Sequence, residues 1–183
     1  MAAALVILLL AVSVVFPATA RAQEGPGCGP TNVTFDVSTK KVQQPAPVPA
    51  SGKAIVYFLQ DDLKYNARPR PTTRFAIDGT WLGATHANSY FYVSVDPGDH
   101  HVCANWQSDV TGLSYIGPKR STAAAHFTAE AGKSYYFRAR DVVYSAPGGP
   151  IVSEPAVELS RLDSDEAQVI INSFSLSSSH PKK

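Results

Sequence analysis

Two histidines and a cysteine stand close together in the sequence, at His100, His101 and Cys103. Imidazole and thiolate groups are good ligands for zinc or copper. Alternation along a strand puts His101 and Cys103 on one face and His100 on the other, so one strand offers two ligands at most. His86 and His126 add ligands only if the fold brings them near. We expect no cofactor, and we keep a metal site built from His100, His101 and His126 as an alternative.

Catalytic motifs are missing from the sequence. It contains no Gly-x-Ser-x-Gly elbow, no His-Glu-x-x-His helix and no Cys-x-x-Cys pair. Acids do occur in suggestive places, since Asp99 precedes His100 and Asp61 precedes Asp62 in an expected loop. Such pairs are common on protein surfaces. We therefore expect no enzyme, and a hydrolytic enzyme that uses the three histidines is the alternative.

Tyrosines recur at alternate positions of two expected strands. Tyr90 and Tyr92 share one face of residues 89–95, while Tyr136 and Arg138 share one face of residues 134–140. If these faces meet solvent, the four side chains form a surface that can stack on sugar rings or peptide aromatics. Ordinary cross-strand pairing explains the same alternation and is the simpler interpretation.

The first 22 residues have the pattern of a cleavable export signal. Residues 2–16 are uncharged, and this run is shorter than the roughly twenty apolar residues that cross a bilayer. It is followed by Pro17 and by Ala20-Arg21-Ala22, a small-x-small cleavage site. We expect a periplasmic or secreted protein that begins at Gln23, without a membrane span; an uncleaved anchor is the alternative.

Cys28 and Cys103 both remain after cleavage. An even number of cysteines in an oxidising compartment favours a disulfide. Such a bridge would close a loop of about 75 residues and stabilise the fold by roughly 4 kcal/mol. It would also remove Cys103 as a metal ligand, whereas two free thiols are the alternative.

Charge argues against a nucleic-acid partner. The chain has 16 basic and 15 acidic residues, and Arg21 leaves with the signal, so the mature chain carries no net charge. Nucleic-acid binding relies on clustered basic residues, and no basic run is present.

The elements that must position these residues are short strands rich in aromatic and β-branched residues, separated by Gly, Pro and Asp. Asp78-Gly79 predicts a tight hairpin between residues 73–77 and 80–83. Residues 130–133 predict a second hairpin, between 123–127 and 134–140. Further strands are expected at 33–37, 89–95, 100–107 and around 157–159. 

One change of period follows the last strand. Ser164 can cap a helix that carries Ala167, Ile170, Ile171 and Phe174 on one stripe. We expect an all-β fold, an antiparallel two-sheet β-sandwich of the immunoglobulin-like or prealbumin-like kind with one short C-terminal helix. The predicted organisation is a signal at 1–22, an N-terminal strand with a proline-rich linker at 23–52, the sandwich at 53–175 and a disordered tail at 176–183.

Four stretches resemble a known family: residues 77–84 (IDGTWLGA), 88–92 (NSYFY), 95–103 (VDPGDHHVC) and 131–137 (AGKSYYF). Together they are similar to the bacterial family catalogued as domain of unknown function 2846 (DUF2846). A looser similarity, at residues 96–100, links the chain to envelope β-modules named after a Pro-Glu-Gly-Ala motif. The resemblance implies an exported, sandwich-like envelope domain and brings no catalytic residues with it. We expect a non-catalytic module that binds another envelope protein or a glycan.

Overall fold

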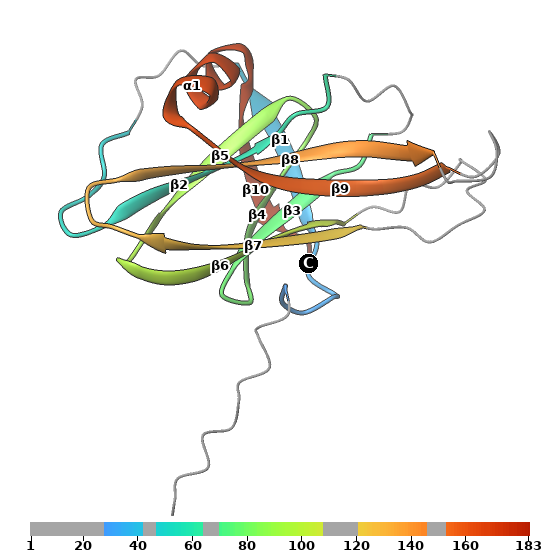
Figure 1. The fold of residues 1–183 in the computed structure, drawn as a ribbon. Coiled ribbons are helices and arrows are strands. Elements are labelled where there is room, and N and C mark those ends of the chain that lie inside the picture. The colour runs from blue at the N-terminus through green and yellow to red at the C-terminus, as the bar shows by residue number, and fades with distance from the viewer. Residues whose placement is uncertain (1–27, 42–46, 64–69, 108–120, 146–152) are drawn as a thin grey trace, which may run out of the picture.

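The structure is a computed structural model that describes residues 28–41, 47–63, 70–107, 121–145 and 153–183. The chain is mostly β-strand and forms two sheets with one short helix near its C-terminus (Figure 1). The elements are β1 (Phe35–Lys40), β2 (Ala54–Gln60), β3 (Thr73–Ile77), β4 (Thr80–Thr85), β5 (Ser89–Val95), β6 (Gly98–Trp106), β7 (Thr122–Ala129), β8 (Ser134–Ser145), β9 (Ser153–Leu162), α1 (Ser164–Ser173) and β10 (Ser175–Pro181). The predicted signal at 1–22 lies outside the described residues.

The six-stranded sheet, called sheet A here, has the order β1-β10-β5-β2-β8-β9, and the four-stranded sheet B has the order β4-β3-β6-β7. Sheet A is mixed, because β2 runs parallel to β8 and β10 runs parallel to β5. The expectation of a wholly antiparallel sandwich is therefore wrong for sheet A. It fails because sequence-adjacent strands such as β7 and β8 lie in different sheets.

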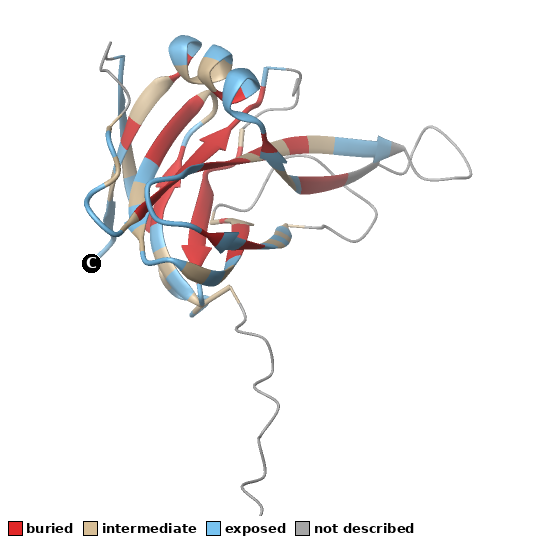
Figure 2. Ribbon diagram, turned by 60° about the vertical axis from the view of Figure 1, so that its left-hand side comes forward, coloured by how far each residue is buried: buried red, intermediate tan, exposed pale blue. Residues whose placement is uncertain are grey.

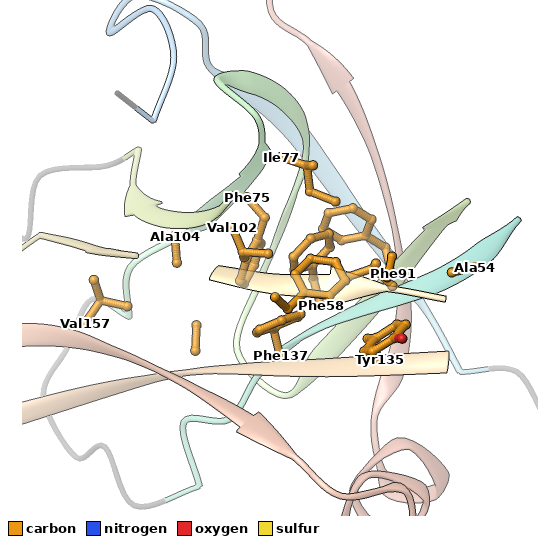
Figure 3. Packing of buried hydrophobic residues seen from close by; sticks show 14 of the residues in the cluster. Ala54, Phe58, Phe75, Ile77, Phe91, Val102, Ala104, Tyr135, Phe137 and Val157 are labelled. Atoms are coloured by element: carbon orange, nitrogen blue, oxygen red, sulfur yellow. The ribbon is translucent and has the colours of Figure 1, made fainter. Parts of the chain in front are cut away.

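The two sheets pack face to face around an apolar core, and β2 lies at the centre of sheet A (Figure 3). Phe58 stacks on Phe75 of sheet B at 4.9 Å between ring centroids, and it also contacts Phe91 and Phe137 within its own sheet. The opposite side of β2, with Tyr57, packs in a second core under α1. This double burial explains why β2 is apolar at consecutive positions rather than alternate ones.

The predicted Asp78-Gly79 hairpin is confirmed between β3 and β4. Both turn residues have positive φ angles, 50° and 77°, as a type I′ turn requires. The second predicted hairpin is wrong, because β7 pairs with β6 in sheet B and β8 pairs with β2 in sheet A. The turn at 130–133 instead docks on the start of β2, where Gly132 N donates to Lys53 O at 2.8 Å.

The C-terminal residues are also ordered. The predicted tail at 176–183 forms most of β10, which lies between β1 and β5. Its small polar side chains find partners, since the Ser177 and Ser89 hydroxyls lie 2.7 Å apart and Ala84 N donates to Ser179 Oγ. Backbone pairing along the whole of β1 therefore orders a segment that has little apolar surface.

Helix α1 forms where it was predicted, although its cap differs by one residue. Asp163, and not Ser164, is the N-cap, and its carboxylate accepts hydrogen bonds from the backbone N–H groups of Asp165 and Glu166. The helix lies on the face of sheet A that points away from sheet B (Figure 1). Among the described residues, no helix has both the length and the apolar character needed to cross a membrane.

Candidate functional site

Two aspartates lie buried together where β2 ends. Asp62 follows β2 and is fully buried, while Asp141 on β8 is 3% exposed. Gln60 Nε2 donates to Asp62 Oδ2 at 2.7 Å and lies 3.5 Å from Asp141 Oδ2. Trp106 Nε1 donates to the other oxygen of Asp141 at 2.7 Å. We call Asp62 and Asp141 the carboxyl pair.

The orientation of Gln60 is fixed by its neighbours. Its Oε1 accepts hydrogen bonds from Thr85 Oγ1 at 3.0 Å and from Thr73 N at 3.3 Å. Its Nε2 also donates to Pro71 O at 2.9 Å. The amide nitrogen must therefore face the carboxyl pair, and the last residue of β2 connects both sheets through hydrogen bonds.

Burial sets the protonation of the carboxyl pair. Loss of solvent raises the pKa of Asp62, and it raises the pKa of Asp141 to about 8 together with the negative charge of Asp62. Two adjacent carboxylates cannot both ionise readily in the protein interior. Burial therefore favours the protonated form of Asp141, and the hydrogen bond between the two carboxyls, which raises the pKa of Asp141 and lowers that of Asp62, makes Asp141 the donor to Asp62.

A carboxyl pair that shares a proton is suited to acid–base chemistry. The nucleophile or acid of an enzyme must also reach its substrate, and here both carboxyl groups contact protein atoms rather than solvent. Among the residues that the structure describes, Asp62 Oδ1 is buried and has no hydrogen-bond partner. In this arrangement the pair connects the end of β2 with β8 and, through Trp106, with the end of β6.

Ion pairs flank the carboxyl pair on β8. Asp61 Oδ2 lies 3.5 Å from Arg140 and 3.9 Å from Arg138. Arg138 also donates to Glu166 on α1 at 2.7 Å. Residues 138 and 140 share one face of β8, and Asp141 points to the other. Both faces of β8 are thus tied to the body of the domain at this point.

Strands β8 and β9 continue well beyond β2 (Figures 1 and 2). The pairing of β2 with β8 covers Ile55–Gln60 and Ser134–Ala139, whereas β8 pairs with β9 as far as Ser145 and Ser153. We call residues 140–145 and 153–158 the arm. Its side chains include the exposed Val143 and Tyr144, which are 43% and 42% exposed.

The predicted tyrosine surface lies on one face of sheet A, but that face is mostly covered. Tyr90 and Tyr136 are each 6% exposed and pack under α1. Gln168 of the helix donates to the Tyr136 hydroxyl at 3.2 Å. Of the four predicted residues, Tyr92 is the one that is substantially exposed, at 37%. Alternation identified the shared face correctly, and α1 turned it into a second core.

The three histidines of the alternative metal site do not meet at one point. His101 and His126 face each other across β6 and β7 with ring centroids 6.0 Å apart. His100 points to the other face, where its Nδ1 lies 2.7 Å from Asp78 Oδ2 and its Nε2 lies 2.9 Å from Asp96 O. Within the described ranges, no three His, Cys, Asp or Glu side chains are grouped as a metal site requires.

Cys28 and Cys103 form the predicted disulfide. The residues after Cys28 lie along the outer face of sheet B, where Trp81 Nε1 donates to Pro30 O at 2.8 Å. Arg74 stacks on Trp81, with its guanidinium carbon 4.2 Å from the ring centroid, and donates to Thr31 O and Val33 O. Both the disulfide and these hydrogen bonds therefore attach the segment after Cys28 to sheet B.

The sequence pattern drew attention to Asp61 and Asp62 but gave no role to Gln60 or Asp141. The two halves of the carboxyl pair are 79 positions apart. The sequence does contain one signal for a buried acid. Asp141 lies in a strand that is rich in aromatic and β-branched residues. An acid in such a strand is more often buried and paired with another group than an acid in a polar surface segment is.

Comparison with known proteins identifies the family. A family model described as "Protein of unknown function (DUF2846)" matches residues 50–150, which include the whole carboxyl pair. Neither the curated proteins nor the solved structures contain a match to the chain. Since the family model covers more than half of the 183 residues, this chain belongs to the DUF2846 family.

Proposed function

We propose that the protein is an exported, non-catalytic domain of the cell envelope that binds a segment of another envelope protein through the arm. The observation that carries this proposal is the arm itself, which extends beyond β2 and exposes Val143 and Tyr144. Val143 and Tyr144 are neighbours in sequence, so the arm presents two adjacent exposed apolar side chains.

The two side chains present apolar surface on both sides of the arm. Neighbouring strand residues point to opposite faces, so Val143 and Tyr144 lie on different faces of β8. Tyr144 also donates to Glu158 on β9, which fixes the ring direction. Tyrosine is enriched at protein interfaces because it offers a large contact area and a polar tip.

Export is supported by the disulfide. Disulfides persist in oxidising compartments and are rare where cellular thiols keep cysteines reduced. The Cys28–Cys103 bridge therefore supports a working location outside the cytoplasm. A protein partner is favoured over a glycan, because most of the tyrosine surface that would have stacked on sugar rings is buried under α1.

Photo-crosslinking tests the binding role. A photoreactive amino acid replaces Tyr144 in the arm, and in a matched control it replaces Val169 on α1, which is 72% exposed. After irradiation of intact cells, we expect a discrete protein adduct from position 144 in the extracytoplasmic fraction and none from position 169. Equal adducts from both positions, or no adduct from position 144, would contradict the proposal.

A further inference from the structure

Asp141 stands at the root of the arm. The last backbone contact between the end of β2 and β8 is the hydrogen bond from Asp61 N to Ala139 O at 2.9 Å. Two residues later, the Asp141 carboxyl contacts Trp106 at the end of β6 and Gln60 at the end of β2. This one side chain therefore connects the arm to both sheets.

The connection depends on a proton. With one proton, the carboxyl pair contains a single negative charge and its two members share a hydrogen bond. Without it, two negative charges face each other in a site from which water is excluded. Of the nearby donors, Gln60 Nε2 reaches both carboxyls, whereas Trp106 Nε1 donates to Asp141 alone. Movement of the arm away from the body relieves this repulsion, because it returns Asp141 to solvent, and it also exposes Val157, the β9 partner of Asp141 that packs in the apolar core.

We propose that the proton shared by Asp62 and Asp141 is a latch that holds the arm against the body, and that loss of this proton releases the arm. The biological meaning of the latch rests on the proposed function, since binding through the arm is then governed by pH. The latch itself is a property of the isolated domain.

The direction of the pH response follows from the pKa of Asp141. In the latched state the pKa is raised to about 8, whereas a released, solvated Asp141 has the ordinary aspartate value near 4. The stabilisation of the latched state is complete below the ordinary value and is lost as the pH rises through about 8. Between about pH 4 and pH 8, the equilibrium constant for release of the arm increases by up to about tenfold per pH unit. Above about pH 8 this constant levels off.

Other charged groups surround the latch. Asp61 pairs with Arg138 and Arg140 on the opposite face of β8, Glu158 lies beside Arg140 on β9, and the charge of Arg70 opposes the pKa rise of Asp62. Guanidinium groups keep their charge throughout this pH range.

Two imidazoles need separate treatment. His86 Nδ1 lies 3.1 Å from Thr72 Oγ1, near the ends of β2 and β6. A His86→Asn variant therefore removes this imidazole from the measured pH response. His100 lies near the other end of β6, about 20 Å from Trp106 along the strand. A readout confined to Trp106 separates the latch from His100.

Acrylamide quenching of Trp106 fluorescence reports release of the arm, because Trp106 is 7% exposed and donates to Asp141. Trp81→Phe removes the other tryptophan. In the complete, oxidised protein we expect the quenching constant to rise between pH 5.5 and 9 and to level off above about pH 8.

Asp141→Asn keeps a neutral side chain that can donate to Asp62, so its quenching constant should stay low at every pH. Asp62→Asn serves as a second variant, which removes the charge that adds to the pKa rise of Asp141 but leaves its burial, so the quenching constant should still rise with pH, but less than in the protein that keeps Asp62. Asp61→Asn is the control, since it removes the ion pairs but leaves the pH response. A quenching constant that does not change with pH, or an undiminished response in Asp141→Asn, would overturn the latch. No partner is needed here, so failure of the latch and failure of the crosslinking test are distinguishable.

Discussion

Removal of the disulfide is the perturbation whose magnitude follows most directly from the structure. The Cys28→Ser and Cys103→Ser substitutions, made together, release a loop defined by a sequence separation of 75 residues. The chain-entropy model assigns such a loop about 4.5 kcal/mol at 25 °C. The hydrogen bonds from Trp81 and Arg74 to residues 30–33 then have to order the N-terminal segment without a covalent tether. We expect the free energy of unfolding to fall by about 4 kcal/mol.

Urea unfolding measures this loss. The double variant should show a lower midpoint and a somewhat larger dependence on urea, because an untethered denatured chain exposes more surface. The reduced wild-type protein is the matched control, and its curve should coincide with that of the variant. A loss below about 1 kcal/mol would refute the argument that the bridge acts by constraining the unfolded chain.

Three further substitutions test local features. Asp163→Ala should lower the free energy of unfolding by about 1 kcal/mol, whereas Ser164→Ala should change it little, because Asp163 is the N-cap; chemical denaturation compares the two. Gly29→Ala should destabilise more than Gly132→Ala in the same assay. Both glycines have positive φ, but a Cβ at Gly29 would lie 2.6 Å from Gly79 O and a Cβ at Gly132 meets no atom within 4 Å. Deletion of residues 175–183 should lower the melting temperature strongly by removing the strand between β1 and β5, and an unchanged melting temperature would restore the disordered-tail hypothesis.

Local turn chemistry explains both the correct and the wrong hairpin. Asp78-Gly79 permits the positive φ angles of a two-residue turn, and a turn this short places β3 and β4 side by side as an antiparallel pair. The turn at 130–133 has the same kind of residues, yet its backbone bonds to Lys53 and Ile55 of another segment. Composition identifies a turn, but it does not say whether the chain returns to the same sheet.

The alternation of residue types identified correctly which side chains share a strand face, but it did not show whether that face is exposed to solvent. The alternation of Tyr90 and Tyr136 placed them on one face, as observed. Whether that face meets water depends on α1, which was expected to cover one face or edge of the sheets, without indication of which one. The prediction of a disordered tail was wrong for a related reason, since Ser177 and Ser179 form hydrogen bonds with residues that are distant in sequence.

The carboxyl pair lay beyond sequence reasoning. Asp62 follows a strand of sheet A, and Asp141 lies in a strand that pairs with it in parallel. Parallel pairing requires a long crossover connection, so the two carboxyl groups meet only after the whole of sheet B has been inserted between β2 and β8. A pattern search along the chain has no means to register such a contact.

Export is the claim on which the proposed function depends, and intact mass tests it most directly. The protein is recovered from the extracytoplasmic fraction and its mass is measured after thiol alkylation, with and without prior reduction. We expect a chain that begins at Gln23 and takes up two alkyl groups only after reduction. A retained signal would contradict cleavage and release outside the cytoplasm, and two thiols that react without reduction would contradict both the compartment and the Cys28–Cys103 bridge.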